Sequence, residues 1–361
     1  MEGARSTTAS FAIEYRRFLS PSGDATATMP DFARDSTQLI NLYQAMVLTR
    51  TFDAKAVALQ RTGRLGTYPS SLGQEAVAVG VAAAMREEDL LLPSFREHGA
   101  QLWRGVTLQD ILLYWGGDER GSASSGPRHD FPVNVPVGSH APHAVGVALA
   151  FKLRGEQCVA VCVMGDGATS KGEVAEALNI AGVWRLPVVF VINNNGWAIS
   201  VPVARQTAAA TLAQKAVAAG IPGEQVDGND VIAVRAAVED ALARARAGNG
   251  PALIEAITYR LSDHTTADDA SRYRSDAEVS QRWNEEPIAR LRRYLVKREL
   301  WTKADEERML TALSTQVDAA VESYLATAPQ PVESIFDHTY ATLPADLADQ
   351  RAAALAARSR R

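Results

Sequence analysis

Apolar residues along this chain follow two kinds of spacing, which together predict alternating strands and helices. Residues 158–163 and 188–192 are short β-branched runs, as expected for strands buried on both faces of a parallel sheet. Between them, residues 172–184 carry apolar side chains at helical intervals and contain no proline, which is typical of a crossover helix. The pattern predicts an α/β fold with a doubly wound, mostly parallel sheet and helices on both faces.

The same patterns divide the chain into an N-terminal arm (1–37), an α/β domain (38–275) and a helical C-terminal extension (276–361). Within the arm, residues 24–31 read as a flexible stretch. Further helices are expected at 39–60, 75–85, 141–153, 207–219 and 231–247, a strand at 251–259, loops at 116–136 and 265–274, several helices over 276–328, and a frayed tail at 352–361.

Composition narrows the class of protein. A length of 361 residues exceeds the usual limit for a single core, and the net charge of −5 gives no reason to expect binding to nucleic acid or to a membrane surface. No apolar run reaches membrane-spanning length. The two cysteines, Cys158 and Cys162, both fall in the first predicted strand and indicate reduced thiols. With no apolar signal core near the N-terminus, these features favour a cytoplasmic protein.

Polar strings follow both predicted strands. Gly165-Asp166-Gly167 ends the first, and Asn193-Asn194-Asn195 ends the second. The carboxyl ends of parallel strands meet at one edge of a sheet, which is where ligands bind in open α/β folds. An ordinary βα turn with a polar loop is the alternative interpretation. A dinucleotide fingerprint would need a third glycine, and the string Gly-x-x-x-x-Gly-Lys-Ser/Thr of a P-loop does not occur.

The residue types at this edge suit a Mg²⁺ ion that shares a diphosphate ligand. Mg²⁺ prefers oxygen donors, and Asp166, the Asn195 side chain and the Trp197 carbonyl supply three. The backbone amides of Gly167 and Ala168 would face the anion. The sequence therefore predicts a site for a divalent metal and a diphosphate.

Several separate short sequence motifs, spread along the chain, make it resemble a known family. The family is the alpha subunit of the thiamine-diphosphate-dependent, decarboxylating component of 2-oxo acid dehydrogenase complexes, in the pyruvate and branched-chain group. The resemblance runs from about Leu39 to about Leu347. The strings are 50–53 (RTFD), 73–76 (GQEA), 95–99 (FREHG), 134–138, 165–172, 193–203, 226–230 (VDGND) and 264–269 (HTTADD).

The resemblance implies roles for individual residues. Arg96 matches the arginine that clamps the cofactor diphosphate, a task suited to its planar fork of donors. Phe95 stands where the family usually has a tyrosine, and it lacks the hydroxyl that would bond to the cofactor diphosphate. Val135 and Val137 match residues whose backbone holds the aminopyrimidine ring. His264 matches a histidine that reaches the diphosphate and the reacting centre, and it is the predicted catalytic residue.

Two more departures from the family pattern concern polar residues. Ser139-His140 replaces the usual Ala-Gln or Thr-Gln, and Ser262-Asp263 precedes His264 where Gly-Pro or Gly-His is more common. His140 and His143 could suggest a metal pair, but no third ligand is in sight, and a polar lining is the favoured interpretation. The 61–68 stretch is expected to line the acyl pocket, where bulky Tyr68 would reduce its size.

The family's activating glutamate, which contacts the aminopyrimidine ring, belongs to a beta subunit. The resemblance therefore implies an α2β2 assembly with the active site between subunits, and a lipoylated dihydrolipoamide acyltransferase as acceptor. The expected cofactors are thiamine diphosphate and Mg²⁺. The expected reaction is oxidative decarboxylation of pyruvate, with a branched-chain 2-oxo acid as the second choice and an acetoin-cleaving enzyme as the third. A catalytically silent assembly subunit is the alternative from another class.

Overall fold

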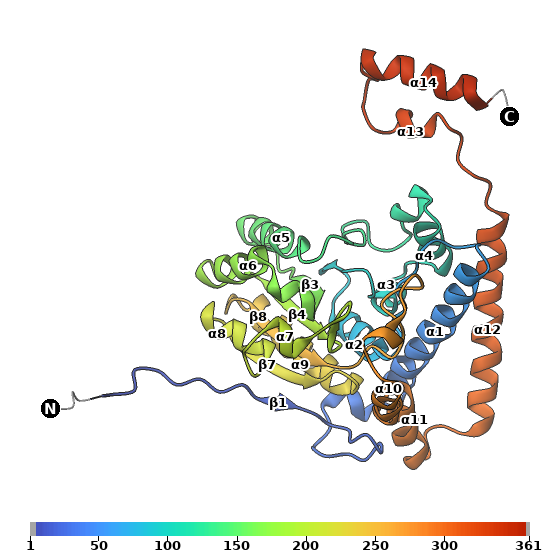
Figure 1. The fold of residues 1–361 in the computed structure, drawn as a ribbon. Helices are drawn as coiled ribbons and strands as arrows, with labels where there is room; N and C mark the ends of the chain where they lie inside the picture. The colour runs from blue at the N-terminus through green and yellow to red at the C-terminus, as the bar shows by residue number, and fades with distance from the viewer. Residues whose placement is uncertain (1–4, 359–361) are drawn as a thin grey trace.

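A six-stranded parallel sheet lies at the centre of the computed structural model, which describes residues 5–358 (Figure 1). The strand order is β1-β7-β8-β4-β3-β2, and every neighbouring pair is parallel. This confirms the predicted α/β class. The strands are β1 (Tyr15–Arg16), β2 (Leu90–Leu92), β3 (Ala160–Gly165), β4 (Val188–Asn194), β7 (Gly223–Asp227) and β8 (Ala252–Ile257), and a separate antiparallel pair is formed by β5 (Trp197–Ala198) and β6 (Val201–Pro202).

Helices cover both faces of the sheet because both faces of its central strands are apolar. Cys162 of β3 packs with helices α5 and α6 on one face, and Val163 packs with α2 and α9 on the other. Burial on both sides explains why the strands read as continuous apolar runs. These helices are α2 (Glu75–Ala84), α5 (His140–Arg154), α6 (Gly172–Val183) and α9 (Val231–Arg246).

A further group of helices packs beside the sheet around the long helix α1 (Figure 1). Arg50 of α1 holds three elements together, because its Nε contacts Glu75 at 2.8 Å and its Nη1 contacts Glu286 at 2.7 Å. The string 50–53 thus has a structural task. The remaining helices are α1 (Ser36–Arg61), α3 (His98–Trp103), α4 (Leu108–Trp115), α7 (Val203–Gln206), α8 (Lys215–Ala218), α10 (Asp276–Arg282), α11 (Pro287–Lys297), α12 (Lys303–Ala326), α13 (Ser334–Asp337) and α14 (Ala345–Arg358).

Part of the expected N-terminal arm completes the sheet. Strand β1 pairs with β7 at the sheet edge. The buried Asp230 carboxylate then accepts the backbone amides of Phe18 and Leu19 at 2.8 and 2.6 Å, and its other oxygen caps α9 through Ile232 and Ala233. The chain therefore joins the folded body from about Tyr15 onward.

Three predictions about helices, strands and the tail differ from the structure. Residues 207–211 are not helical, because the Thr211 side chain caps a 3₁₀ turn that starts at Leu212 and leads into α8. The expected frayed tail is helical up to Arg358, and Arg351 pairs with Asp337 to join α14 to α13. Cys158 precedes β3 instead of lying in it, although both cysteines are free as expected. Residues 1–4 and 359–361 lie outside the described range.

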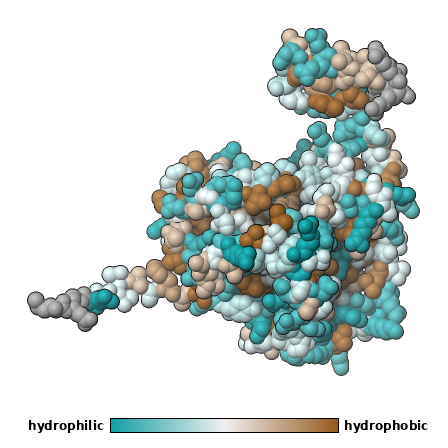
Figure 2. Space-filling model, in the orientation of Figure 1, coloured by the Kyte–Doolittle hydropathy of each residue, from teal (hydrophilic) through white to brown (hydrophobic). Residues whose placement is uncertain are grey.

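The surface of the described residues mixes polar and apolar side chains. Figure 2 shows hydrophilic and hydrophobic atoms interspersed on one face, with hydrophobic atoms gathered near the middle of the body. Among residues 5–358, no helix has the length and apolar character needed to cross a bilayer.

Candidate cofactor and active site

One cavity of about 520 Å³ opens at the carboxyl ends of β3 and β4. It brings together every metal-binding, cofactor-binding and catalytic residue that the sequence predicted, from five separate segments of the chain. The roles of these residues stay predictions, but the fold does bring them into one cavity. These residues are Phe95, Arg96, Val135, Val137, Asp166, Gly167, Ala168, Asn195, Trp197 and His264.

Asp166 is the first residue after β3, and its side chain is almost fully buried, with 1% of the residue exposed. One carboxylate oxygen accepts a hydrogen bond from Gln206 Nε2 at 2.6 Å. Burial raises the pKa of the Asp166 carboxyl, and the Gln206 hydrogen bond opposes that rise. A buried carboxylate without a basic side chain in hydrogen-bond contact is well suited to hold a cation.

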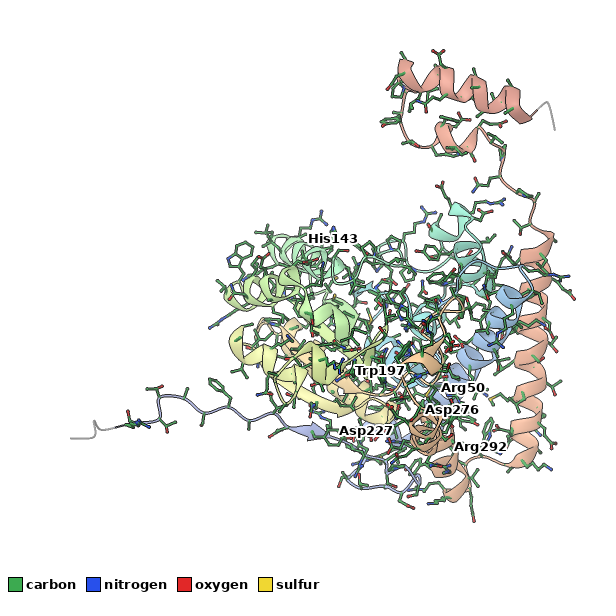
Figure 3. All side chains as sticks on the ribbon, viewed as in Figure 1. Arg50, His143, Trp197, Asp227, Asp276 and Arg292 are labelled. Carbon is green, nitrogen blue, oxygen red and sulfur yellow. The ribbon has the colours of Figure 1, made fainter. Side chains whose placement is uncertain are left out.

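Asn195 lies in the turn that follows β4, and Trp197 begins β5 at the end of that turn; Figure 3 shows Trp197 near the middle of the body. The Asn195 Oδ1 accepts the Trp197 backbone amide at 3.1 Å, and its Nδ2 donates to Gln74 Oε1 at 3.0 Å. These bonds fix which way the amide faces. The Trp197 carbonyl is within 3.4 Å of Arg260 Nη1. The turn therefore carries one amide oxygen and one carbonyl beside the Asp166 carboxylate.

The polar edge of the cavity contains groups whose hydrogen-bonding capacity is not used within the chain. Gln74 Nε2 and Asn193 Oδ1 are buried without a partner, and both residues line the cavity. At Gly167, an added Cβ would lie 2.8 Å from the Ala198 Cβ, so a side chain would crowd the site. A spare donor, a spare acceptor and a glycine at a point of close approach fit a polar, phosphate-bearing cofactor with its metal.

Arg96 and His264 form a close pair in the cavity wall. Arg96 Nη2 lies 2.9 Å from His264 Nδ1 and 2.6 Å from its carbonyl, and Arg260 Nη1 lies 3.4 Å from the same Nδ1. Guanidinium groups only donate, so Nδ1 must accept and the ring proton must sit on Nε2. Burial, followed by the charges of Arg96 and Arg260, lowers the pKa of His264 to about 4. His264 is thus a neutral imidazole with one N–H to offer.

Phe95 takes part through its ring, which meets the His264 ring edge to face at a centroid distance of 6.0 Å. It offers no hydroxyl. Val135 and Val137 line the cavity with about half of their surface exposed. Their segment is held by Asn134, whose Nδ2 donates to Ser139 Oγ at 3.0 Å and contacts His140 Nδ1 at 2.7 Å.

His140 and His143 do not act as a pair. His140 is buried, contacts the Val163 carbonyl at 2.8 Å through Nε2 and lines the cavity. His143 is exposed on α5, and Figure 3 shows it well away from Trp197. Among residues 5–358, no group of three or more His, Cys, Asp or Glu side chains is arranged to hold a metal. The structure thus places His140, but not His143, in the lining of the cavity.

Tyr68 does not line the cavity, so the prediction that it narrows the acyl pocket is wrong. The residue is fully buried behind the wall, and its neighbours Thr67 and Pro69 face the cavity together with Trp115. Alternation along an extended segment turns Tyr68 inward.

Sequence reasoning also missed Glu97 and Arg260. Glu97 is a buried carboxyl in the cavity lining, and burial raises its pKa to about 7. Arg260 is fully buried between the Trp197 turn and the 262–274 loop, where it contacts the Ile199 carbonyl and Tyr273 Oη at 2.9 and 2.7 Å. Glu97 lies within a family string, but nothing in the sequence singles out Arg260.

Comparison with known proteins gives the family. The model of the dehydrogenase E1 component family matches residues 43–333. The chain belongs to this family. Membership confirms the resemblance, makes the chain part of a 2-oxo acid dehydrogenase, which is an oxidoreductase, and implies thiamine diphosphate as the cofactor of the E1 component.

Individual relatives of this E1 chain are named as alpha subunits. It is 44% identical over 342 residues to the 3-methyl-2-oxobutanoate dehydrogenase subunit alpha of Mycobacterium tuberculosis, covering 94% of this chain and 93% of the relative. It is 42% identical to the pyruvate dehydrogenase E1 component subunit alpha of Acholeplasma laidlawii, covering 86% and 91%, and 39% identical to that of Staphylococcus aureus, covering 89% and 87%.

Proposed function

We propose that this chain is the alpha subunit of a pyruvate dehydrogenase. With a beta subunit it would decarboxylate pyruvate oxidatively and acetylate the lipoyl group of a dihydrolipoamide acyltransferase. The observation that carries the proposal is the single cavity in which Asp166 and Asn195 face the same space as Arg96 and His264. Relatives named as pyruvate dehydrogenase alpha subunits support it. A silent assembly subunit would have no need to keep this set of side chains together.

The sheet edge is the proposed anchor for Mg²⁺ and the diphosphate. The Asp166 carboxylate, the Asn195 Oδ1 and the Trp197 carbonyl are hard oxygen donors of the kind that Mg²⁺ takes. The amides of Gly167 and Ala168, with the Arg96 guanidinium, would bind the diphosphate oxygens. When bound, thiamine diphosphate supplies the electron sink that decarboxylation requires.

His264 is the proposed catalytic side chain. Because Arg96 and Arg260 hold its Nδ1 as an acceptor, the Nε2–H is available to donate to an anionic oxygen of cofactor or substrate. A pKa of about 4 keeps the ring neutral at physiological pH, so His264 would act as a hydrogen-bond donor without changing its charge.

The activating glutamate is assigned to a beta subunit. Glu97 is the glutamate found among the lining residues of the described cavity, but its Oε2 accepts the Arg96 amide at 3.2 Å. The residues proposed here thus bind the cofactor without activating it. An α2β2 assembly follows from two-fold symmetry, which is the common closed arrangement of paired subunits.

Reduction of a redox dye by pyruvate tests the proposal. The chain alone should be inactive, and addition of a beta chain should restore turnover. Glu97→Gln, assayed with the beta chain, separates the two glutamates, because activity should persist in this variant. Full turnover by the isolated alpha chain would contradict the assignment of the glutamate to a partner.

A branched-chain 2-oxo acid is the second candidate substrate, favoured by the similarity to the alpha subunit from Mycobacterium tuberculosis. Steady-state rates on pyruvate, 2-oxobutyrate and 3-methyl-2-oxobutanoate with the co-expressed beta chain distinguish the two. The substrate with the highest kcat/KM decides between them.

A further inference from the structure

A chain of hydrogen bonds leads from the cavity wall into the interior. Trp115, the last residue of α4, lines the cavity, and its indole Nε1 donates to His98 Nε2 at 3.1 Å. His98 Nδ1 lies 3.0 Å from the Tyr68 hydroxyl, which lies 3.1 Å from Asp53 Oδ1. His98, Tyr68 and Asp53 are all buried. Four side chains from four segments thus form one connected series.

The direction of every bond in the series follows from its first member. An indole N–H can only donate, so His98 Nε2 must accept and the ring proton must sit on Nδ1. Nδ1–H therefore donates to the Tyr68 oxygen, and the Tyr68 O–H donates to Asp53. Asp53 can act as the final acceptor because it also accepts from Ser70 Oγ at 2.5 Å and from the Ser71 amide at 2.7 Å. No member can be reversed without losing a bond.

Aromatic packing fixes the same side chains a second time. The Tyr68 ring stacks on His98 with centroids 5.1 Å apart and planes 15° apart. The Trp115 ring meets both edge to face, at 6.0 Å from Tyr68 and 6.1 Å from His98. Bonds and packing together allow the indole one orientation, so this part of the wall is rigid.

Backbone contacts place the indole on the His264 side of the cavity. The Gly66 amide donates to the Trp115 carbonyl at 3.1 Å, and the Thr266 amide donates to the Tyr68 carbonyl at 3.0 Å. The stretch between them, which includes Thr67, therefore bridges the end of α4 and the segment that carries His264. Trp115, Thr67 and His264 all line the cavity. The indole of Trp115 therefore lies in the part of the cavity wall that adjoins the segment carrying His264.

We propose that Trp115 is a specificity-determining residue whose indole limits the size of the acyl chain of the 2-oxo acid, and that His98, Tyr68 and Asp53 are positioning residues that hold it. The inference rests on the proposed function, in which this cavity takes a 2-oxo acid. It assigns substrate size to Trp115 and not to Tyr68, because only Trp115 faces the cavity.

Substrate competition tests the role of Trp115. The quantity to measure is the kcat/KM for 3-methyl-2-oxobutanoate divided by the kcat/KM for pyruvate. In the assembled enzyme carrying Trp115→Leu, this ratio should be at least about 10-fold above that of wild type. A methylene or two of added space changes discrimination in kcat/KM by roughly 10- to 200-fold. Trp115→Phe keeps an aromatic ring in the packed cluster and should raise the ratio less. Trp184→Leu, at a half-exposed tryptophan next to α6, is the matched control and should leave the ratio unchanged.

Tyr68→Phe tests the positioning residues. The change removes the acceptor of the His98 Nδ1 proton without altering a residue of the cavity lining, so the indole loses its fixed orientation. The ratio should rise in the same direction as in Trp115→Leu but by less, mainly through a lower KM for the branched acid. A purely structural role would lower the rates on both acids equally and would leave the ratio unchanged.

The outcomes separate this inference from the proposed function. If wild type decarboxylates a 2-oxo acid with the beta chain but the ratios of Trp115→Leu and Trp115→Phe stay within about twofold of wild type, the size limit is not at Trp115 and the inference fails alone. If wild type with the beta chain acts on none of the three 2-oxo acids, the proposed function fails and the inference fails with it.

Discussion

The two sides of the cavity are built on opposite principles. At the sheet edge, buried polar atoms of Gln74 and Asn193 have no partner, and the Asp166 carboxylate accepts its side-chain hydrogen bond from the neutral amide of Gln206. On the helical side, the polar atoms of the Trp115–His98–Tyr68–Asp53 series are all engaged with one another. The edge is arranged to receive a ligand, and the wall is arranged to keep a shape.

This contrast teaches how to separate binding from stability in the same cavity. Unused hydrogen-bonding capacity costs free energy of folding and is recovered only when a ligand supplies the partners. A satisfied network contributes to stability whether or not a ligand is present. Substitutions at the sheet edge should therefore weaken cofactor binding without destabilising the free protein. Substitutions in the helical wall should destabilise the free protein without weakening cofactor binding.

Asp166→Ala should have the largest effect, by abolishing Mg²⁺-dependent binding of thiamine diphosphate. Loss of a charged metal ligand should cost at least ~2 kcal/mol, which is about 30-fold in affinity. Since burial raises the pKa of this carboxyl, its removal should not lower the melting temperature of the free protein at pH 8. Titration calorimetry and thermal unfolding measure the two. Asp318→Ala, at an exposed aspartate, is the control, and an affinity within a factor of about two of wild type would exclude Asp166 as the anchor.

Asp53→Ala should give the reverse pattern. It leaves the donors of Tyr68, Ser70 and Ser71 buried without an acceptor, which should lower the free energy of unfolding by about 2–3 kcal/mol. Urea denaturation of the free protein measures the loss, and calorimetry on the fraction that remains folded should find thiamine diphosphate affinity close to wild type. Equal loss of stability and affinity in both Asp variants would remove the distinction between the two sides.

Glu97→Gln sharpens the comparison through its pH dependence. The folded pKa of Glu97, about 7, lies above its ordinary value, so its contribution to stability is complete below pH 4.5 and declines as pH rises to about 7. Glutamine cannot ionise. The stability of the variant relative to wild type should therefore grow between pH 5 and pH 8, by about 2–3 kcal/mol, and should be flat above that. Melting temperatures across this range test it, and a constant difference would mean that Glu97 does not change charge there.

The smallest effect is expected at loop 262–274, where cofactor binding should slow proteolytic cleavage several-fold. The loop is held mainly by polar contacts; for example, the His264 backbone amide donates to the Asp268 carboxylate at 2.9 Å. Its few apolar residues give it little packing. Trypsin should cleave after exposed Arg272 faster in the free protein than with Mg²⁺ and thiamine diphosphate. Cleavage after exposed Arg298 on the body is the internal control. Equal cleavage at Arg272 in both conditions would show that the loop is already ordered.

The sheet edge was largely predictable from the sequence, whereas the helical wall was not. Local patterns place Asp166 and Asn195 at the ends of adjacent strands, and parallel strands bring such residues together without further information. Trp115 and His98 meet only because α3 and α4 fold back beside α1, which depends on tertiary packing. Tyr68 was assigned to the wrong side of its segment, because alternation fixes which residues share a face but not which face is inside.

The ends of the molecule were the hardest to predict for a similar reason. A two-residue strand such as β1 has no periodicity to detect, and its pairing with β7 is decided by a distant partner. The start of α14 is equally hidden, since alanine-rich sequence close to a terminus reads as a tail.

The Asp230 carboxylate bonds to the N-terminal segment through one oxygen and to α9 through the other, and this has a consequence for folding. The amide of Phe18 is 212 positions before the carboxylate that receives it, so this segment is synthesised long before Asp230 and can dock only after Asp230 has been made. Contacts of such long range slow folding. Until β1 pairs with β7, the edge of β7 is open to pairing with other chains. Chains truncated to lack residues 15–19 should therefore aggregate through β7, whereas the intact chain should cover that edge once β7 and α9 have formed.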